Sequence, residues 1–263
     1  FIPEVSRGTL CISSQVGCTL NCKFCFTGTQ RLVRNLTSEE IISQLLLARD
    51  QLVDWPTNKF RKISNIVFMG MGEPLANLPA LLPSLDQILS PKGLGIGARH
   101  ITLSTSGLVP KILELAKYPA QIRLAISLHG GDNDTRRKIM PINDRYSIES
   151  LLDACESFIE ERKKMITLEY ILIEGINDDL NQADLLAKHA KRLNAKVNLI
   201  PYNQVEGLEW KRPELTQIRA FHKKVELGGA ARVTLRMEKG HDIDAACGQL
   251  RLRETSERPT ESS

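Results

Sequence analysis

Short aliphatic runs alternate along the chain with longer stretches of helical periodicity, and this alternation limits the possible folds more than any other feature. Parallel strands need long crossover connections, and amphipathic helices supply them, so the pattern predicts repeated βα units around a parallel sheet. We predict strands over residues 9–13, 65–69, 100–104, 122–127, 166–173 and 196–200, and an edge strand over 233–237. We predict helices over residues 38–54, 78–89, 109–116, 148–161, 180–193 and 215–227.

The number of units selects the architecture. Six units cannot close the eight-unit barrel, so the predicted fold class is α/β, an open six-unit (β/α) partial barrel with a short C-terminal extension. The length of 263 residues and the hydrophobic content of 42% suit one core domain, which we place over residues 1–252. Residues 253–263 include no large apolar side chain and are predicted to form a disordered tail.

Composition narrows the cellular setting. The formal charge of +4 is compatible with RNA binding but does not require it. No apolar run approaches the roughly 18 residues of a membrane span, and no secretory leader is recognisable, so we expect a soluble, cytoplasmic protein. A reducing cytoplasm also suits cysteines that are free or that bind metal. The chain starts with Phe1, so we expect the sequence to begin inside a longer gene product.

Three cysteines lie close together near the start of the chain: Cys18, Cys22 and Cys25, with gaps of three and two residues. A loop that directs three thiolates to one centre leaves a metal or cluster one protein ligand short, which is typical of catalytic rather than structural sites. Iron–sulfur clusters normally take four cysteines, so a substrate or cofactor would occupy the remaining iron. Zinc is the alternative, with a fourth ligand from elsewhere in the chain.

The cysteine spacing, with the aromatic Phe24 before the last cysteine, resembles the radical S-adenosylmethionine (SAM) signature, in which a [4Fe-4S] cluster carries SAM on its fourth iron. Residues 8–17 and 242–250, which contain Cys11 and Cys247, further resemble the RlmN/Cfr family of RNA adenine methyltransferases. The resemblance spans residues 1–252 and implies a radical SAM partial barrel. It also implies 23S rRNA and tRNA as substrates, an electron-donor protein such as a flavodoxin, and a monomeric enzyme.

Candidate ligand-binding residues follow the predicted strands, because the carboxyl ends of the strands gather at one end of a barrel. Gly72 and Glu73 form either an ordinary turn or a site for an ammonium group. The resemblance implies that both bind the SAM amino group. It assigns further SAM contacts to Ser104, Ser127, Leu128, His129 and Asn203. Taken singly, the serines are also typical of hydroxyls that satisfy loop backbone, and His129 is also typical of a structural histidine.

The remaining cysteines are of two kinds. Cys155 lies on the apolar stripe of a predicted helix and is expected in the core. Cys11 and Cys247 are either packing residues or, as the resemblance implies, catalytic thiols. In the family chemistry Cys247 takes a methyl group from one SAM, and a radical generated from a second SAM activates that methyl for addition to adenine. Cys11 then releases the product by forming a disulfide with Cys247.

An adenine must leave its stack to reach the end of a barrel, so unpaired RNA is the expected substrate. Basic residues that could hold its phosphates are Arg31, Arg34, Arg136, Arg137, Lys138, Lys211 and Arg212. The family's N-terminal accessory domain is absent from this sequence. The family's proton-accepting Glu would precede Phe1 and is not matched by Glu4.

Two alternatives stand beside methylation of adenine carbon 2. A Cfr-type enzyme would use the same cysteines to methylate carbon 8 of the rRNA adenine. A non-catalytic, zinc-stabilised RNA-binding protein would use Cys18, Cys22, Cys25 and a fourth thiol such as Cys11. The overall resemblance, including the segment around Cys247, favours carbon 2.

Overall fold

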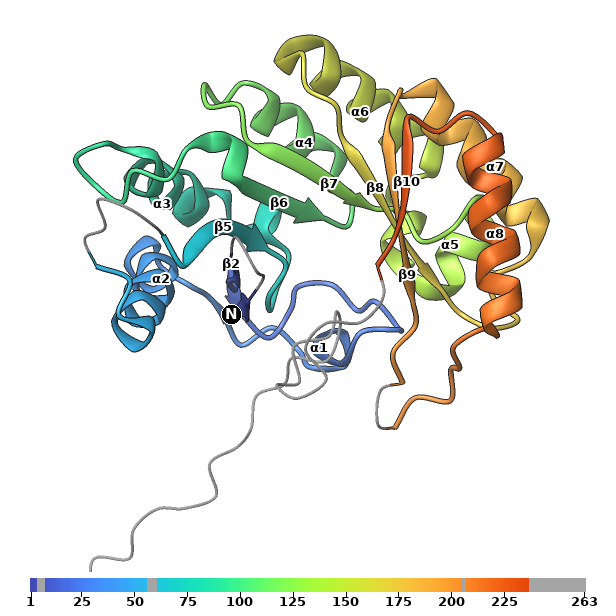
Figure 1. Cartoon of the computed structure of the whole chain (residues 1–263), viewed down its shortest axis with the longest axis horizontal. Coiled ribbons are helices and arrows are strands. Elements are labelled where there is room, and N and C mark those ends of the chain that lie inside the picture. The colour runs from blue at the N-terminus through green and yellow to red at the C-terminus, as the bar shows by residue number, and fades with distance from the viewer. Residues whose placement is uncertain (4–7, 56–60, 205–206, 237–263) are drawn as a thin grey trace, which may run out of the picture.

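An eight-stranded sheet forms the body of the protein, in a computed structural model that describes residues 1–3, 8–55, 61–204 and 207–236. Its order is β1-β2-β5-β6-β7-β8-β9-β10, and every pair from β2 to β10 is parallel. The edge strands β1 and β10 are not joined, so the sheet is an open partial barrel (Figure 1). The parallel strands are β2 (Gly8–Cys11), β5 (Ile63–Phe68), β6 (Ile101–Thr105), β7 (Arg123–Ser127), β8 (Thr167–Leu172), β9 (Lys196–Pro201) and β10 (Arg232–Leu235).

The predicted fold class and all predicted strands, the edge strand included, are confirmed, with boundaries that differ by a few residues. Three short strands were not predicted: β1 (Ile2–Pro3), which pairs antiparallel with β2, and the small hairpin of β3 (Gln15–Val16) and β4 (Arg34–Asn35). The predictions for Glu4, Cys247 and the tail at 253–263 concern positions outside the described residues.

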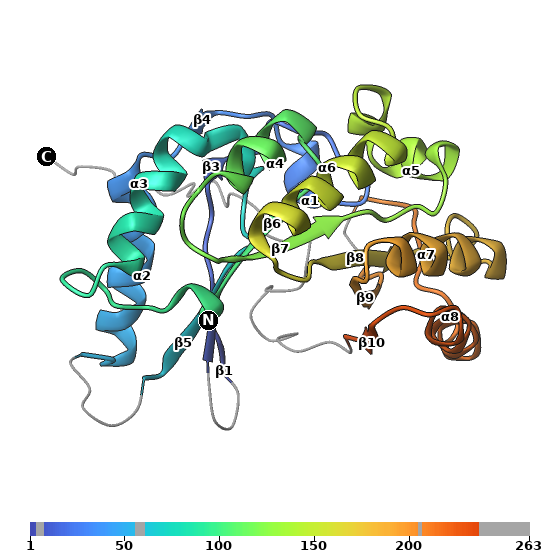
Figure 2. The same cartoon turned by 90° about the horizontal axis from the view of Figure 1, so that it is seen from above.

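Six helices follow the strands and lie along the outer face of the curled sheet (Figures 1 and 2). They are α2 (Ser38–Leu52), α3 (Leu78–Leu89), α4 (Val109–Ala116), α6 (Ile148–Arg162), α7 (Leu180–Arg192) and α8 (Leu215–Leu227), and all six were predicted. Two short helices were not: α1 (Phe26–Thr29) and α5 (Asn133–Ile139). None of the helices in the described ranges has the length and apolar character needed to cross a bilayer.

Local sequence explains where these elements begin and which way they face. Thr37 and Glu40 form a reciprocal capping box that starts α2, in which the Thr37 Oγ1 accepts from the Glu40 N–H at 3.2 Å. On the strands, alternate residues point to opposite faces, and Leu10, Leu103 and Leu168 pack outward against the helices. The intervening residues therefore face the inside of the curl, where the polar side chains of the strands collect.

One expected RNA contact is wrong. Arg136, on α5, has no exposed surface, so it cannot hold a phosphate. Its guanidinium donates to the backbone carbonyls of Leu128 at 3.1 Å and Ser106 at 2.6 Å, and to the Asn143 side chain at 3.0 Å. Burial lowers its pKa to about 10, while the neighbouring Cys22 thiol opposes that shift. Arg136 therefore ties the ends of β6 and β7 to α5.

Replacing Arg136 with Met should lower the free energy of unfolding by about 3–5 kcal/mol, because three buried acceptors lose their donor. Its neighbour Arg137 provides the matched control: it is half-exposed and pairs with Asp134 at 2.7 Å on the surface. Arg137→Met should cost less than about 1 kcal/mol. Urea unfolding of both variants measures the difference, and equal losses would contradict the structural role of Arg136.

Candidate active site

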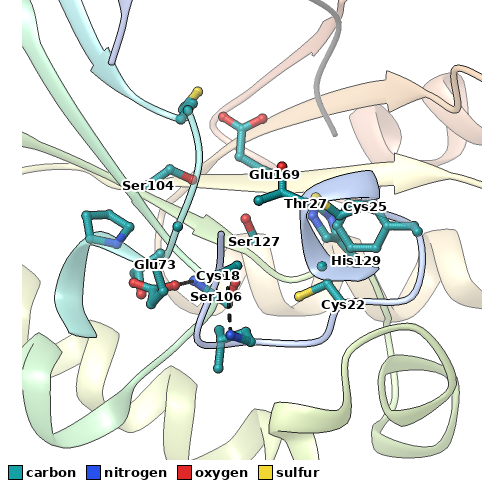
Figure 3. A pocket seen from close by; sticks show the side chains of 18 of the residues that line it. Cys18, Cys22, Cys25, Thr27, Glu73, Ser104, Ser106, Ser127, His129 and Glu169 are labelled. Carbon is teal, nitrogen blue, oxygen red and sulfur yellow. Dashed lines mark hydrogen bonds between the residues drawn. The ribbon is translucent and has the colours of Figure 1, made fainter. Parts of the chain in front are cut away.

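A pocket opens at the carboxyl ends of the strands, where loops from several βα units meet (Figure 3). Eight of the predicted site residues line it: Cys18, Cys22, Cys25, Gly72, Glu73, Ser104, Ser127 and His129. The cysteines come from the loop after β2 and the start of α1, whereas the others come from β5, β6 and β7 and the loops that follow them. The parallel topology thus brings together residues that are more than a hundred positions apart in the sequence.

The side chain of Gln15 holds the cysteine loop in place. It is buried, and its amide nitrogen donates to the Thr19 hydroxyl at 2.6 Å and to the Asn35 side chain at 2.7 Å. Its amide oxygen accepts from the backbone N–H of Thr19 at 3.2 Å and of Glu73 at 2.9 Å. One amide therefore joins the loop that carries Cys18 to the turn that carries Glu73. Sequence reasoning missed this residue.

The three thiols are close enough to influence one another. Burial raises the pKa of Cys18 to about 11 and that of Cys22 to about 12, and the charge of Cys25 raises both further. Burial also raises the pKa of Cys25, against hydrogen bonds from the backbone of Gly28 and Thr27. Thiols of this kind ionise only when a positive centre replaces the proton, which is what binding to iron or zinc does.

The arrangement of the thiols favours a cluster over a single ion. Within the described ranges, no three His, Cys, Asp or Glu side chains are arranged to hold one metal ion. A tetrahedral zinc site draws its sulfurs to about 3.8 Å from one another, given Zn–S bonds of about 2.3 Å. A [4Fe-4S] cluster binds each cysteine to a different iron atom, so its sulfurs lie farther apart. The three cysteines fit the cluster, and the zinc alternative is not favoured.

The Gly72–Glu73 turn closes one side of the pocket. Gly72 has φ +98°, and a Cβ there would lie 2.5 Å from the Gln15 Cβ, so the close approach requires glycine. The buried Glu73 carboxylate accepts from the backbone N–H of Leu75 at 3.0 Å and of Ser106 at 2.8 Å. Burial raises its pKa, and these hydrogen bonds oppose the shift. Each carboxylate oxygen keeps a second lone pair with which to accept from an ammonium group.

His129 lies on the opposite side and is held in one tautomer. Its Nδ1 accepts the backbone N–H of Ile171 at 3.1 Å, so in the neutral ring the proton is on Nε2. Burial, reinforced by the charge of Arg136, lowers the His129 pKa to about 3, so the ring is neutral at physiological pH. The Phe24 ring meets it edge to face at 4.9 Å between centroids. This contact connects the aromatic residue of the cysteine motif to β7.

Four predicted residues lie elsewhere. Leu128 points into the outer core, and its backbone N–H and carbonyl are bonded to Glu169 and Arg136. Asn203 follows β9 and has a buried Oδ1 without a hydrogen-bond partner among the described residues. Cys11 ends β2 between the outward-facing Leu10 and Ile12, so it faces the inside of the curl. Cys155 is fully buried in the outer core, as predicted.

A second carboxylate lines the pocket and was not predicted. Glu169, in the middle of β8, is 6% exposed and accepts from the Asn198 side chain at 2.7 Å. Burial raises its pKa to about 6, against the Asn198 hydrogen bond and the charge of Arg236. The available signal was an acidic residue inside an otherwise apolar run, 166–173.

The comparisons with known proteins agree with this geometry. The profile of the Radical SAM superfamily matches residues 12–186. A probable dual-specificity RNA methyltransferase RlmN from Akkermansia muciniphila is 52% identical over 98% of this chain and 69% of its own length. A probable dual-specificity RNA methyltransferase RlmN 3 from Opitutus terrae is 53% identical over 96% of this chain and 68% of its own length. The chain belongs to the RlmN family. A solved structure of a radical SAM methyltransferase from Sphaerobacter thermophilus is 42% identical to this RlmN-family chain, with a TM-score of 0.87 over 92% of the chain and 70% of its own.

The pocket of this RlmN-family protein suits a positively charged nucleoside such as SAM. Among the described residues that line it there are two carboxylates, Glu73 and Glu169, and no lysine or arginine. SAM carries a sulfonium and an ammonium group against one carboxylate, so its net charge is positive. The apolar side chains of Ile171 and Ile200 line the same pocket and can pack against a purine. Together with the three cysteines, these residues fit the cluster and SAM that the superfamily uses.

The raised pKa of Glu169 predicts a pH-dependent stability. Because the folded state binds the proton more tightly than the unfolded chain, this contribution is complete below the unfolded pKa of 4.5 and is lost as pH rises through about 6. Removing the buried charge in Glu169→Gln should therefore stabilise the apoprotein by up to about 2 kcal/mol near pH 8 and by almost nothing near pH 4. Urea unfolding at the two pH values tests this, with the exposed Glu160→Gln as reference. A gain that does not change with pH would contradict the assignment.

Proposed function

We propose that this protein is a radical SAM methyltransferase that methylates carbon 2 of an adenine in 23S rRNA and in tRNA. The observation that carries the proposal is the identity of 52–53% to dual-specificity RNA methyltransferases over almost the whole chain, combined with the three cysteines in the pocket. The polar route to carbon 2 is closed, because a carbon between two ring nitrogens is too electron-poor to attack a methyl cation equivalent. A radical route needs a cluster site, and the pocket supplies its ligands.

The residues of the chain have separate tasks in this proposal. Cys18, Cys22 and Cys25 hold the [4Fe-4S] cluster, which together with SAM supplies the radical when bound. Glu73 holds the SAM amino group, and Ser104, Ser127 and the Nε2–H of His129 orient the rest of the cofactor. Burial in a pocket with few polar groups excludes water from the radical. Asn203, with its unpaired Oδ1 beyond β9, and the backbone near Leu128 complete the proposed cofactor site.

Two thiols carry the methyl transfer and the release of the product. Cys247 accepts a methyl group from SAM by displacement and presents it for transfer to the base. Cys11, on the inner face of β2, attacks Cys247 as a thiolate and frees the methylated RNA, leaving a disulfide that an external thiol reduces. We further propose that the enzyme acts as a cytoplasmic monomer and receives electrons from a small protein such as a flavodoxin.

The reaction is tested by anaerobic turnover with SAM, reductant and an adenine-containing RNA, followed by mass spectrometry of the nucleosides. We expect 2-methyladenosine at a level that depends on added SAM. Chromatography against standards separates it from 8-methyladenosine, the product of a Cfr-type enzyme. Detection of the 8-methyl isomer alone would overturn the choice of carbon, and the absence of any methylated adenosine would overturn the function.

The role of Cys11 is tested by Cys11→Ala, which should stop at the stage where RNA is still bonded to Cys247. We expect a protein–RNA adduct that survives denaturing electrophoresis, and a Cys247 peptide with the mass of a linked adenosine after nuclease and protease digestion. Cys155→Ala is the matched control, because this thiol lies in the outer core and away from the pocket. It should release its product as the parent does. Multiple turnover by Cys11→Ala without an adduct would sink the assignment.

A further inference from the structure

A row of polar side chains crosses the inside of the sheet at one level. Ser127 on β7 is in register with Glu169 on β8, Glu169 with Asn198 on β9, and Asn198 with Thr234 on β10. Their chain neighbours, such as Leu168, Tyr170, Val197 and Leu199, pack into the outer core. The four polar residues therefore share the inner face. We call Ser127, Glu169, Asn198 and Thr234 the polar row.

The row holds one acceptor toward the pocket. The Thr234 hydroxyl donates to the Asn198 Oδ1 at 3.0 Å, which fixes the Asn198 amide so that its nitrogen donates to the Glu169 Oε2 at 2.7 Å. No described residue donates to the other carboxylate oxygen, Oε1, although the side chain is 6% exposed and lines the pocket. A buried carboxylate oxygen without a donor is costly unless a ligand supplies one.

The chemistry of that oxygen limits the ligand. An ionised carboxylate only accepts hydrogen bonds, so its partner must be a donor. Neighbouring parallel strands lie about 4.8 Å apart, and Ser127 also lines the pocket, so a pair of adjacent hydroxyls fits between Ser127 and Glu169. A nucleoside ribose with free 2′ and 3′ hydroxyls offers such a pair. In RNA the 3′ oxygen is esterified, so the free pair belongs to SAM.

We propose that Glu169 is a positioning residue that accepts a hydrogen bond from a ribose hydroxyl of SAM through Oε1, with Ser127 as its partner on the adjacent strand and Asn198 and Thr234 as its support. This inference rests on the proposed function, because it needs SAM in the pocket. Glu169 and Glu73 then bind the two parts of one ligand. Glu73 takes the amino group at the cysteine end, and Glu169 takes the ribose at the β8 side.

The test is equilibrium binding to the cluster-loaded protein under anaerobic conditions, so no turnover is needed. Its ligands are SAM and its 2′-deoxy and 3′-deoxy analogues. The parent should bind the analogue that lacks the bonded hydroxyl about tenfold or more weakly than SAM, the effect of a hydrogen bond to a charged group. In Glu169→Gln, Asn198 still donates to the amide oxygen, and an NH2 group replaces Oε1. This variant should bind SAM about tenfold more weakly and lose most of the discrimination.

Two further arms make the outcomes distinct. Glu160→Gln, an exposed change on α6, should retain both affinity and discrimination. RNA carrying 2′-deoxyadenosine at the target position should show the same relative affinity for the parent and Glu169→Gln. Parent-like discrimination by Glu169→Gln would overturn the inference while the proposed function stands, and a change confined to the RNA arm would give the carboxylate to the RNA ribose instead. A parent protein that binds no SAM would overturn the proposed function itself.

Discussion

The hydrogen bonds of Gln15 are the interaction on which the geometry of the site depends. The cysteine loop lies between β2 and α2 and contains only short elements, so it has little regular hydrogen bonding of its own. A single buried amide supplies the missing order, because it contacts Thr19 twice, Asn35 and the backbone of Glu73. The same approach leaves no room for a side chain at position 72, where a Cβ would meet Gln15 at 2.5 Å. The ligands of the cluster and the turn that binds the SAM amino group are therefore positioned by one residue.

Three buried charges show that the pocket is organised around function more than around stability. Burial shifts the pKa values of Glu73, Glu169 and Arg136 toward their neutral forms, and none of the three has an ion pair of opposite charge among the described residues. Arg136 is compensated by backbone carbonyls and Glu73 by backbone N–H groups. Glu169 has a single side-chain donor, so it retains the largest unmet demand for a ligand. Residues that lower stability in this way are expected at sites that bind substrates or cofactors.

The sequence was sufficient for the sheet because apolar alternation and helical periodicity report directly on burial. The cysteine spacing likewise predicted three ligands on one loop. It failed for α5, whose sequence Asn133–Ile139 has no apolar stripe and begins with a cap from Asp132 to the Thr135 N–H at 2.7 Å. For the same reason Arg136 was grouped with its exposed neighbours Arg137 and Lys138, since only the fold shows which of three basic residues points inward. Gln15 and Glu169 were missed because their partners are distant in sequence, 58 residues away for the Glu73 N–H and 29 for Asn198.

The distribution of charge in the pocket also restricts how a ligand can be oriented. The cysteine side carries Glu73, the β8 side carries Glu169, and the neutral His129 contributes a donor from the loop after β7. A ligand with an amino group at one end and ribose hydroxyls farther along satisfies both carboxylates in one direction only, because the amino acid end must lie at the cysteines. In the reverse direction the ligand carboxylate would face Glu169, and the two like charges would repel each other in a desolvated site. The pair of carboxylates thus selects the orientation of the nucleoside by repulsion as well as by hydrogen bonding, before any contact from the RNA is made.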